Sequence, residues 1–274
     1  MKSFVTRLIS GIFIILIALY TIITGGELLF AVVIILSMIG LFELFRVFGV
    51  QDKLPGFIGY LAAAGYYALL YFGLSDFYLL VFLGAIALLL FVYVIAFPKY
   101  TAEQIMCTFF GVFYVAVMLS YIYQTRMLGD GVFVVWLIFI ASWGSDTGAY
   151  CVGVLMGKHK MTPKLSPNKS VEGAIGGVVV AVLMGTAYGW FVQYALGYTN
   201  RTKVIMAVIC GLGAILGQLG DLAASAIKRN KDIKDYGNLI PGHGGVLDRF
   251  DSVIVTAPVI YYLAFFFGKM NGML

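Results

Sequence analysis

Residues 77–98 read FYLLVFLGAIALLLFVYVIAFP, and no charged side chain interrupts them. A helix needs about 20 mostly apolar residues to cross a bilayer, so this run is long enough to span one. It is too long for a strand of a transmembrane barrel, which takes roughly 10 residues. A helix also satisfies its own backbone hydrogen bonds inside lipid. The segment therefore predicts a transmembrane helix.

Similar apolar runs recur along the whole chain. The 274 residues are 62% hydrophobic and 11% charged, and the mean hydropathy is +0.99. Soluble domains carry about 25% charged residues, so lipid must cover much of this protein. The predicted spans are Leu8–Gly26, Leu28–Phe48, Leu54–Ser75, Phe77–Pro98, Gln104–Thr125, Gly131–Leu155, Gly173–Asn200, Val204–Ile227 and Ser252–Gly268. We expect an all-α polytopic membrane protein with nine transmembrane helices.

The basic residues predict how these helices are oriented. If the N-terminus is cytoplasmic, fourteen of the eighteen Lys and Arg residues face the cytoplasm. The four that face outward are Arg126, Arg201, Lys203 and Lys269. Cytoplasmic loops of membrane proteins carry an excess of Lys and Arg, so this asymmetry favours that orientation. The net charge of +5 then serves topology and contact with anionic lipid, and we expect no nucleic acid as a partner.

Polar residues divide the chain into two functional parts. Residues 1–125 hold five predicted spans joined by short loops, and we expect a structural role for them. There, Glu43 and Arg46 are expected to form a local ion pair, because residues three apart are neighbours on a helix. Residues 126–274 hold four predicted spans and two polar loops, 157–173 and 228–251, and we expect them to be catalytic.

Two carboxylates lie inside predicted spans of the second part. A carboxylate in lipid is costly unless it pairs, takes a proton or binds a cation. Asp221 shares a helix face with Ser225 and Lys228, and its plain structural alternative is a buried salt bridge. Asp146 has Ser142 four residues before it and Tyr150 four residues after it. Its plain alternative is a hydrogen-bonded packing residue in a glycine-rich helix.

The stretch KDYGNLIPGHGGVLDRFDS, residues 234–252, leads directly into the last predicted span. Asp248 and Asp251 lie three residues apart at its end. Acidic side chains favour helix N-termini, so capping alone could explain Asp251. Capping does not explain two carboxylates beside Arg249. Carboxylates that converge from separate helices are typical of sites for hard cations, so we expect a metal.

The other polar loop is basic. Residues 157–177 read GKHKMTPKLSPNKSVEGAIGG, and Ser170 is placed to cap the helix that follows. A helix N-terminus with Lys nearby forms an anion site. The alternative is a solvated basic loop that serves topology. Carboxylates for a metal and basic groups for phosphate at one membrane face favour phosphoryl or nucleotidyl transfer.

The run SAIKRNKDIKDYGNLIPGHGGVLDRFD, residues 225–251, resembles the signature of the phosphatidate cytidylyltransferases, also called CDP-diglyceride synthetases. The segments SDTGAYCVGVLMGKH, residues 145–159, and LSPNKSVEG, residues 165–173, are also similar to that family. The resemblance is dense over residues 142–252. Asn168 stands where the family commonly has a basic residue or Gln. The earlier helices agree only in being membrane spans.

The resemblance implies that the chain transfers the cytidylyl group of CTP to phosphatidic acid, giving CDP-diacylglycerol and pyrophosphate. It implies Mg²⁺ as cofactor, with K⁺ as a possible second cation, a homodimer, and a bacterial inner or plasma membrane with the active site facing the cytoplasm. The implied catalytic residues are Asp221, Asp248, Lys228 and His243. The implied metal ligands are Asp221 and Asp248, with Asp146 and Asp251 nearby. The implied substrate-binding residues are Ser166, Asn168, Lys169, Ser170, Arg229, Lys234, Gly244, Gly245 and Arg249.

Two other functions remain open from the sequence. A CTP-dependent polyprenol or phytol kinase has related loops, but the full run from Lys228 to Asp251 argues against it. A cation transporter would use intramembrane carboxylates as an ion path. Transporters often show internal repeats and charges near the bilayer midplane. Here the polar residues cluster toward one face, and the sequence shows no repeat.

Overall fold

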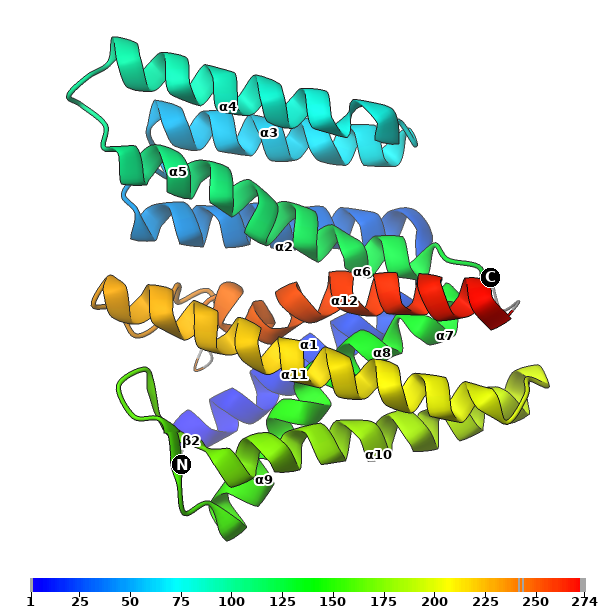
Figure 1. The fold of residues 1–274 in the computed structure, drawn as a ribbon. Coiled ribbons are helices and arrows are strands. Elements are labelled where there is room, and N and C mark those ends of the chain that lie inside the picture. Colours follow the sequence, from blue (N-terminus) through cyan, green and yellow to red (C-terminus); the bar gives the residue numbers. More distant parts are fainter. Residues whose placement is uncertain (1, 241, 243, 272–274) are drawn as a thin grey trace. The chain divides into compact units, whose positions relative to one another are not determined.

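The computed structural model describes residues 2–240, 242 and 244–271, and most of them form helices (Figure 1). The helices are α1 (Lys2–Thr24), α2 (Gly26–Val47), α3 (Leu54–Tyr71), α4 (Tyr78–Ile95), α5 (Ala102–Gly111), α6 (Met118–Arg126), α7 (Gly131–Val134), α8 (Trp136–Phe139), α9 (Ser145–Met156), α10 (Val171–Leu196), α11 (Arg201–Asn230) and α12 (Leu247–Asn271). Shorter turns are η1 (Ser75–Phe77), η2 (Val112–Val117) and η3 (Ile140–Gly144).

The predicted all-α membrane fold is confirmed. In the described part of the chain, eight helical segments are long and apolar enough to cross a membrane, and α1 contributes a shorter apolar segment, Gly11–Thr24. Two predicted spans are composite helices. The fifth runs through α5, η2 and α6, and the sixth runs from α7 to α9. The helix that contains the last predicted span begins at Leu247, so Asp248 lies in its first turn.

The chain divides into two compact units that are not single stretches of sequence. Unit 1 comprises Met1–Phe13, Glu27–Ser120 and Asp235–Asp248. Unit 2 comprises Ile14–Gly26, Tyr121–Lys234 and Arg249–Leu274. The polar segment before α12 therefore groups with the N-terminal helices. The division of function at residue 125 stays a prediction.

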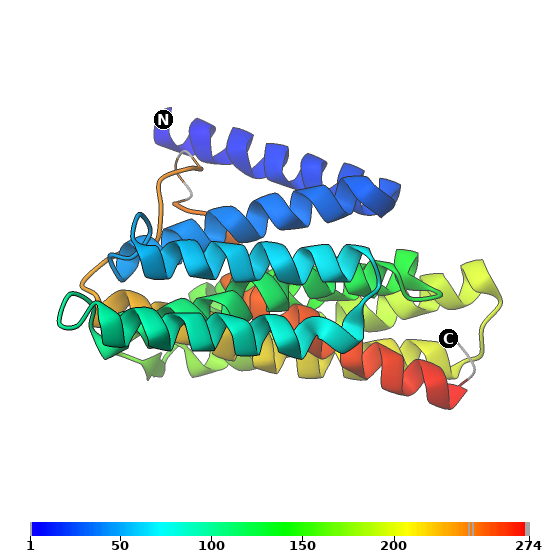
Figure 2. The ribbon, with the colours of Figure 1, turned by 90° about the horizontal axis from the view of Figure 1, so that it is seen from above.

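Unit 1 is held together by aromatic and hydroxyl contacts between helices. In both ribbon views α3 and α4 lie side by side (Figures 1 and 2). The buried Tyr67 of α3 contacts the Ser37 hydroxyl at 2.7 Å and donates to the Ala116 carbonyl at 2.9 Å. Polar groups in lipid need such internal partners, so these bonds fix how α2, α3 and η2 pack.

Unit 2 packs α10 closely against α9 and α11 through glycines. A Cβ at Gly148 would lie 2.7 Å from Val180, and one at Gly176 would lie 2.5 Å from Val152. Small residues let helix backbones approach closely. They pack within the unit, so they do not argue for a second copy of the chain, and dimerisation stays a prediction.

The basic loop contains a short hairpin that the sequence did not predict. β1 (Lys160–Thr162) pairs antiparallel with β2 (Ser166–Ser170). Such short strands are stable only when something anchors them. Here the Glu172 carboxylate accepts backbone N–H bonds from Lys158 at 3.1 Å and from His159 at 3.2 Å. The hairpin is thereby fixed to the start of α10.

Candidate active site

In unit 2 the candidate site is built around an ion pair between Lys169 of β2 and Asp221 of α11. Both side chains are partly exposed, at 30% and 22%. The Ser225 hydroxyl donates to Asp221 Oδ1 at 3.5 Å, so the predicted common face of these two residues is confirmed. The alternative interpretation of Asp221 as a salt-bridge partner also holds. Its partner, Lys169, is one of the predicted substrate-binding residues.

Asp146 of α9 and Asp251 of α12 meet at Ser252. The Ser252 hydroxyl donates to Asp146 Oδ2 at 3.0 Å, and its backbone N–H donates to Asp251 Oδ1 at 2.9 Å. The charge of Asp221 interacts with both carboxylates. Three of the four predicted metal ligands therefore lie in the same region of unit 2.

Ser142 and Tyr150, which stand four residues before and after Asp146, lie in different surroundings. Ser142 is buried and donates to the Ile138 carbonyl of its own helix at 2.7 Å. Tyr150 is 72% exposed. Ser142 lies in the π-helical turn η3, which ends at Gly144, so its spacing to Asp146 does not follow the α-helical repeat.

The donor atoms of this cluster suit a hard cation. Carboxylate and hydroxyl oxygens are the ligands that Mg²⁺ and K⁺ prefer over nitrogen or sulfur. Among the residues that the structure describes, no three His, Cys, Asp or Glu side chains form a ready metal-binding group. The oxygen donors are compatible with a cation, and the binding, identity and number of cations stay predictions.

Two further contacts position Lys169. Ser170 caps α10, because its hydroxyl accepts the Gly173 N–H at 3.1 Å, as predicted. Arg229, near the end of α11, donates to the Leu165 carbonyl at 3.3 Å. The hairpin is thus held to α10 at one end and to α11 at the other. This arrangement brings an ammonium group to a carboxylate that lies 52 positions later in the sequence.

The other predicted substrate-binding side chains lie around this cluster or at the loop surface. Asn168, Arg229, Lys234 and Arg249 are exposed, whereas Ser166 and Lys228 are half-buried. The charge of Lys228 interacts with that of Asp251. The indole of Trp143 donates to the Arg249 carbonyl at 3.4 Å. His243 lies outside the described residues, so its catalytic role stays a prediction.

In unit 1, Asp248 organises the polar segment before α12. It is 6% exposed, and its Oδ2 atom accepts N–H bonds from Tyr236 at 2.7 Å and from Gly245 at 3.0 Å. A carboxylate that accepts two backbone donors fixes the loop between them. Asp248 belongs to unit 1 and Asp221 to unit 2. Their joint role in metal binding therefore stays a prediction.

The local structure explains why glycine occupies positions 244 and 245 of this segment. Gly244 has a φ of +85°, which only glycine adopts readily. A Cβ there would lie 2.9 Å from Asp248 Oδ2. A Cβ at Gly245 would lie 2.4 Å from Glu43 Oε1. Both positions thus need glycine because of close carboxylates, and their predicted contact with phosphate stays a prediction.

Glu43 and Arg46 are the residues that the sequence interpretation missed. Instead of pairing with each other locally, both bind the segment before α12. Glu43 accepts the N–H groups of Val246 at 3.0 Å and Leu247 at 2.9 Å, and Arg46 donates to the Tyr236 carbonyl at 2.5 Å. The available signal was the presence of two charges in an otherwise apolar span, which marks function by default.

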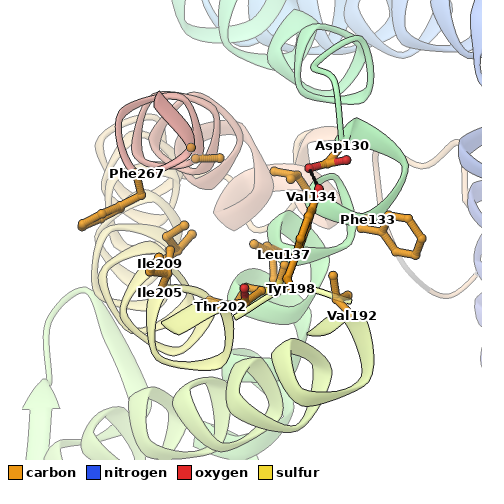
Figure 3. A pocket seen from close by; sticks show the side chains of 13 residues that line it. Asp130, Phe133, Val134, Leu137, Val192, Tyr198, Thr202, Ile205, Ile209 and Phe267 are labelled. Atoms are coloured by element: carbon orange, nitrogen blue, oxygen red, sulfur yellow. Dashed lines mark hydrogen bonds between the residues drawn. The ribbon is translucent and has the colours of Figure 1, made fainter. Parts of the chain in front are cut away.

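A second polar pair in unit 2, formed by Tyr198 and Asp130, borders a pocket. The phenol of Tyr198 donates to Asp130 beside an apolar pocket lined by residues of α7, α8, α10, α11 and α12 (Figure 3). This hydrogen bond, together with burial, raises the pKa of Tyr198 to about 12. The pocket wall is almost entirely apolar, with Leu137, Ile205 and Phe267 among its side chains. It offers no basic groups for phosphate, so the Asp221 cluster remains the candidate site.

Comparisons with known proteins agree with these features. The model of the cytidylyltransferase family matches residues 5–267. A phosphatidate cytidylyltransferase of Bacillus subtilis is 33% identical over 270 residues, which cover 96% of this chain and 98% of the relative. Proteins of the same name from Staphylococcus haemolyticus and Staphylococcus aureus are 40% and 39% identical over 153 residues. Each of these matches covers 56% of both chains.

Proposed function

This chain belongs to the cytidylyltransferase family, and we propose that it transfers the cytidylyl group of CTP to phosphatidic acid, giving CDP-diacylglycerol and pyrophosphate. The observation that carries the proposal is the similarity to a phosphatidate cytidylyltransferase over 96% of the chain. The cluster of carboxylates and basic groups in unit 2 supports the reaction class, because phosphoryl chemistry requires positioning and charge neutralisation above all.

The reaction is a displacement at phosphorus. A phosphate oxygen of the lipid attacks the α-phosphorus of CTP, and the bond from that phosphorus to the oxygen that bridges to the β-phosphorus breaks. The bonding electrons leave with pyrophosphate. No general base is required, because a phosphate monoester is already largely ionised near pH 7. Lys169, Lys228, Arg229, Lys234 and Arg249 neutralise the phosphates of both substrates.

Cations complete the proposed site. Asp221 and Asp248 would hold Mg²⁺, with Asp146 and Asp251 beside it and K⁺ as a possible second ion. Mg²⁺ would supply charge neutralisation for the phosphate oxygens. Lys169 is the residue that contacts Asp221 directly. It is therefore placed to exchange a carboxylate partner for a phosphate partner when the substrates bind.

An isotope experiment tests the reaction. Purified protein is incubated with phosphatidic acid, Mg²⁺ and CTP labelled at the α-phosphorus. We expect label to move into the lipid phase, because the α-phosphoryl group stays with the cytidine that is transferred. With CTP labelled at the γ-phosphorus, we expect label only in aqueous pyrophosphate.

The γ-labelled reaction also separates this proposal from a lipid kinase. A kinase transfers the γ-phosphoryl group, so it would place γ-label in the lipid and leave α-label in aqueous CDP. That result would replace the cytidylyltransferase assignment. Absence of both labels from the lipid, in a preparation whose thermal unfolding is cooperative, would reject either activity for phosphatidic acid.

The protein is an integral membrane protein, as its apolar helices indicate. We further propose a bacterial plasma membrane and a cytoplasmic active site, since the relatives named above are bacterial and CTP is made in the cytoplasm. The distribution of Lys and Arg supports this orientation.

Cysteine labelling tests the orientation. The native Cys107, Cys151 and Cys210 are free thiols, so they are first replaced by alanine. In that background, Lys160→Cys and Lys231→Cys should react with a membrane-impermeant maleimide only in inverted vesicles. Arg201→Cys is the matched control and should react only in intact cells. Labelling of either cytoplasmic position in intact cells would reverse the proposed orientation.

A further inference from the structure

The buried carboxylate of Glu43 in α2 binds the backbone at the start of α12. Glu43 is 3% exposed, and each of its two oxygens accepts one backbone N–H, from Val246 and from Leu247. A Cβ at Gly237 would lie 2.2 Å from Glu43 Oε1. The carboxylate thus contacts both ends of the segment 235–248 within unit 1.

The first turn of α12 explains why an acceptor is needed there. The first N–H groups of a helix have no partner inside the helix, and in a membrane protein they cannot be left bare. The Oδ2 atom of Asp248 accepts two other N–H groups, those of Tyr236 and Gly245. Glu43 supplies the missing acceptors from another helix, with a negative charge that suits a helix N-terminus.

A buried charge is a costly way to satisfy two amides. A polar residue at the start of α12 could cap the helix locally at less cost. The chain instead keeps Glu43 and Arg46 in an apolar span, and both bind the polar segment. The presence of these two charged residues in an apolar span indicates that they fix the conformation of the polar segment, in addition to any effect on the stability of the bundle.

We propose that Glu43 is a positioning residue for the proposed cytidylyl transfer, which fixes the described residues 244–248 so that Asp248 is presented in one conformation. Arg46 assists by holding the Tyr236 carbonyl. This role rests on the proposed function. It is not a catalytic role, because Glu43 acts through the backbone of Val246 and Leu247.

The test compares Glu43→Gln with Ser37→Ala. Ser37 lies on the same helix, is buried and bonds Tyr67, so its loss weakens the bundle without touching the segment. We expect Glu43→Gln to lower kcat by roughly 10- to 100-fold, the usual effect of an outer-shell partner, while the KM for CTP changes little. Glu43→Asp, which keeps the charge, should recover part of kcat. Ser37→Ala should lower the Tm at least as much and leave kcat near that of the unchanged protein.

Hydrogen exchange gives a readout that does not depend on activity. The amide hydrogens of Val246 and Leu247 should exchange faster in Glu43→Gln than in the unchanged protein. In Ser37→Ala their exchange rates should stay the same. If the unchanged protein makes no CDP-lipid, the proposed function fails, and exchange alone then decides whether Glu43 holds the segment. Slow exchange in Glu43→Gln, or equal kcat losses in the two variants, would overturn the proposal.

A second variant covers the case in which Glu43→Gln does not fold. Gly237→Ala places a methyl group against Glu43 Oε1 from the loop side, without removing the charge. We expect Gly237→Ala to lower kcat by roughly 10- to 100-fold as well. In the double variant that combines Glu43→Asp with Gly237→Ala, the effects on kcat should not add, because both changes act on one contact. Unaltered kcat in Gly237→Ala would contradict the positioning role.

Discussion

Replacing Asp221 with Asn should lower turnover by roughly two to three orders of magnitude, the usual loss when one preorganised electrostatic contact is removed from a catalytic site. Asn keeps the size of the side chain but removes the charge that binds Lys169 and that would bind a cation. Because both partners of the ion pair are partly exposed, the loss of the pair should change the free energy of unfolding by only about 0–1 kcal/mol. Turnover with saturating CTP and the Tm in detergent measure the two effects.

Asp130→Asn is the matched control for this change. Asp130 lies in the same unit and bonds Tyr198, but it borders the apolar pocket of Figure 3. It should leave turnover unchanged. Near-normal turnover in Asp221→Asn, or an equal loss in both variants, would remove Asp221 from the site.

Asp248 should give a second large effect that has two separable parts. In Asp248→Asn the amide oxygen can still accept the N–H groups of Tyr236 and Gly245, so the loop should stay in place while the charge is lost. We expect turnover to fall by roughly two to three orders of magnitude with little change in Tm. In Asp248→Ala both the charge and the two acceptors are lost. The buried amides then lack partners, at a cost of about 1–3 kcal/mol each, and the Tm should fall as well.

The comparison of the two variants decides what Asp248 does. Turnover and Tm are measured for both, with hydrogen exchange at Tyr236 and Gly245 as a local probe. If Asp248→Asn is active and only Asp248→Ala is not, Asp248 anchors the loop and binds no cation. If both lose turnover while Asp248→Asn keeps slow exchange, the charge itself is required.

The sequence predicted the helices well because lipid imposes a simple rule. Backbone groups in a membrane must be satisfied within the helix, so apolar runs such as Phe77–Pro98 permit one structure only. The hairpin β1–β2 was missed for the opposite reason. Its strands are short and polar, carry a proline at Pro167, and are held by Glu172 and Arg229 rather than by any pattern of their own.

In the site, too, contacts between residues close in sequence were predicted, whereas contacts between residues far apart in sequence were not. Ser170 was predicted as a cap because its partner Gly173 is three residues away. Glu43 was assigned to Arg46 for the same local reason, yet its true partners lie 203 and 204 positions later. A single sequence does not show which distant residues such a side chain will bind. Only the cost of a charge in an apolar span pointed to a distant partner.

The turn η3 has a consequence for how related chains should be aligned. A π-helical turn holds one residue more than the α-helical turn it replaces, and one residue corresponds to about 100° of rotation about the helix axis. The whole of α9 after Gly144 is therefore rotated relative to α8 by that one additional residue. A relative that lacks one residue between positions 140 and 144 would keep its hydropathy and its length almost unchanged. Its aspartate at the position of Asp146 would nevertheless point toward a different neighbour than Ser252, so a gap at this turn changes function where a gap in a surface loop would not.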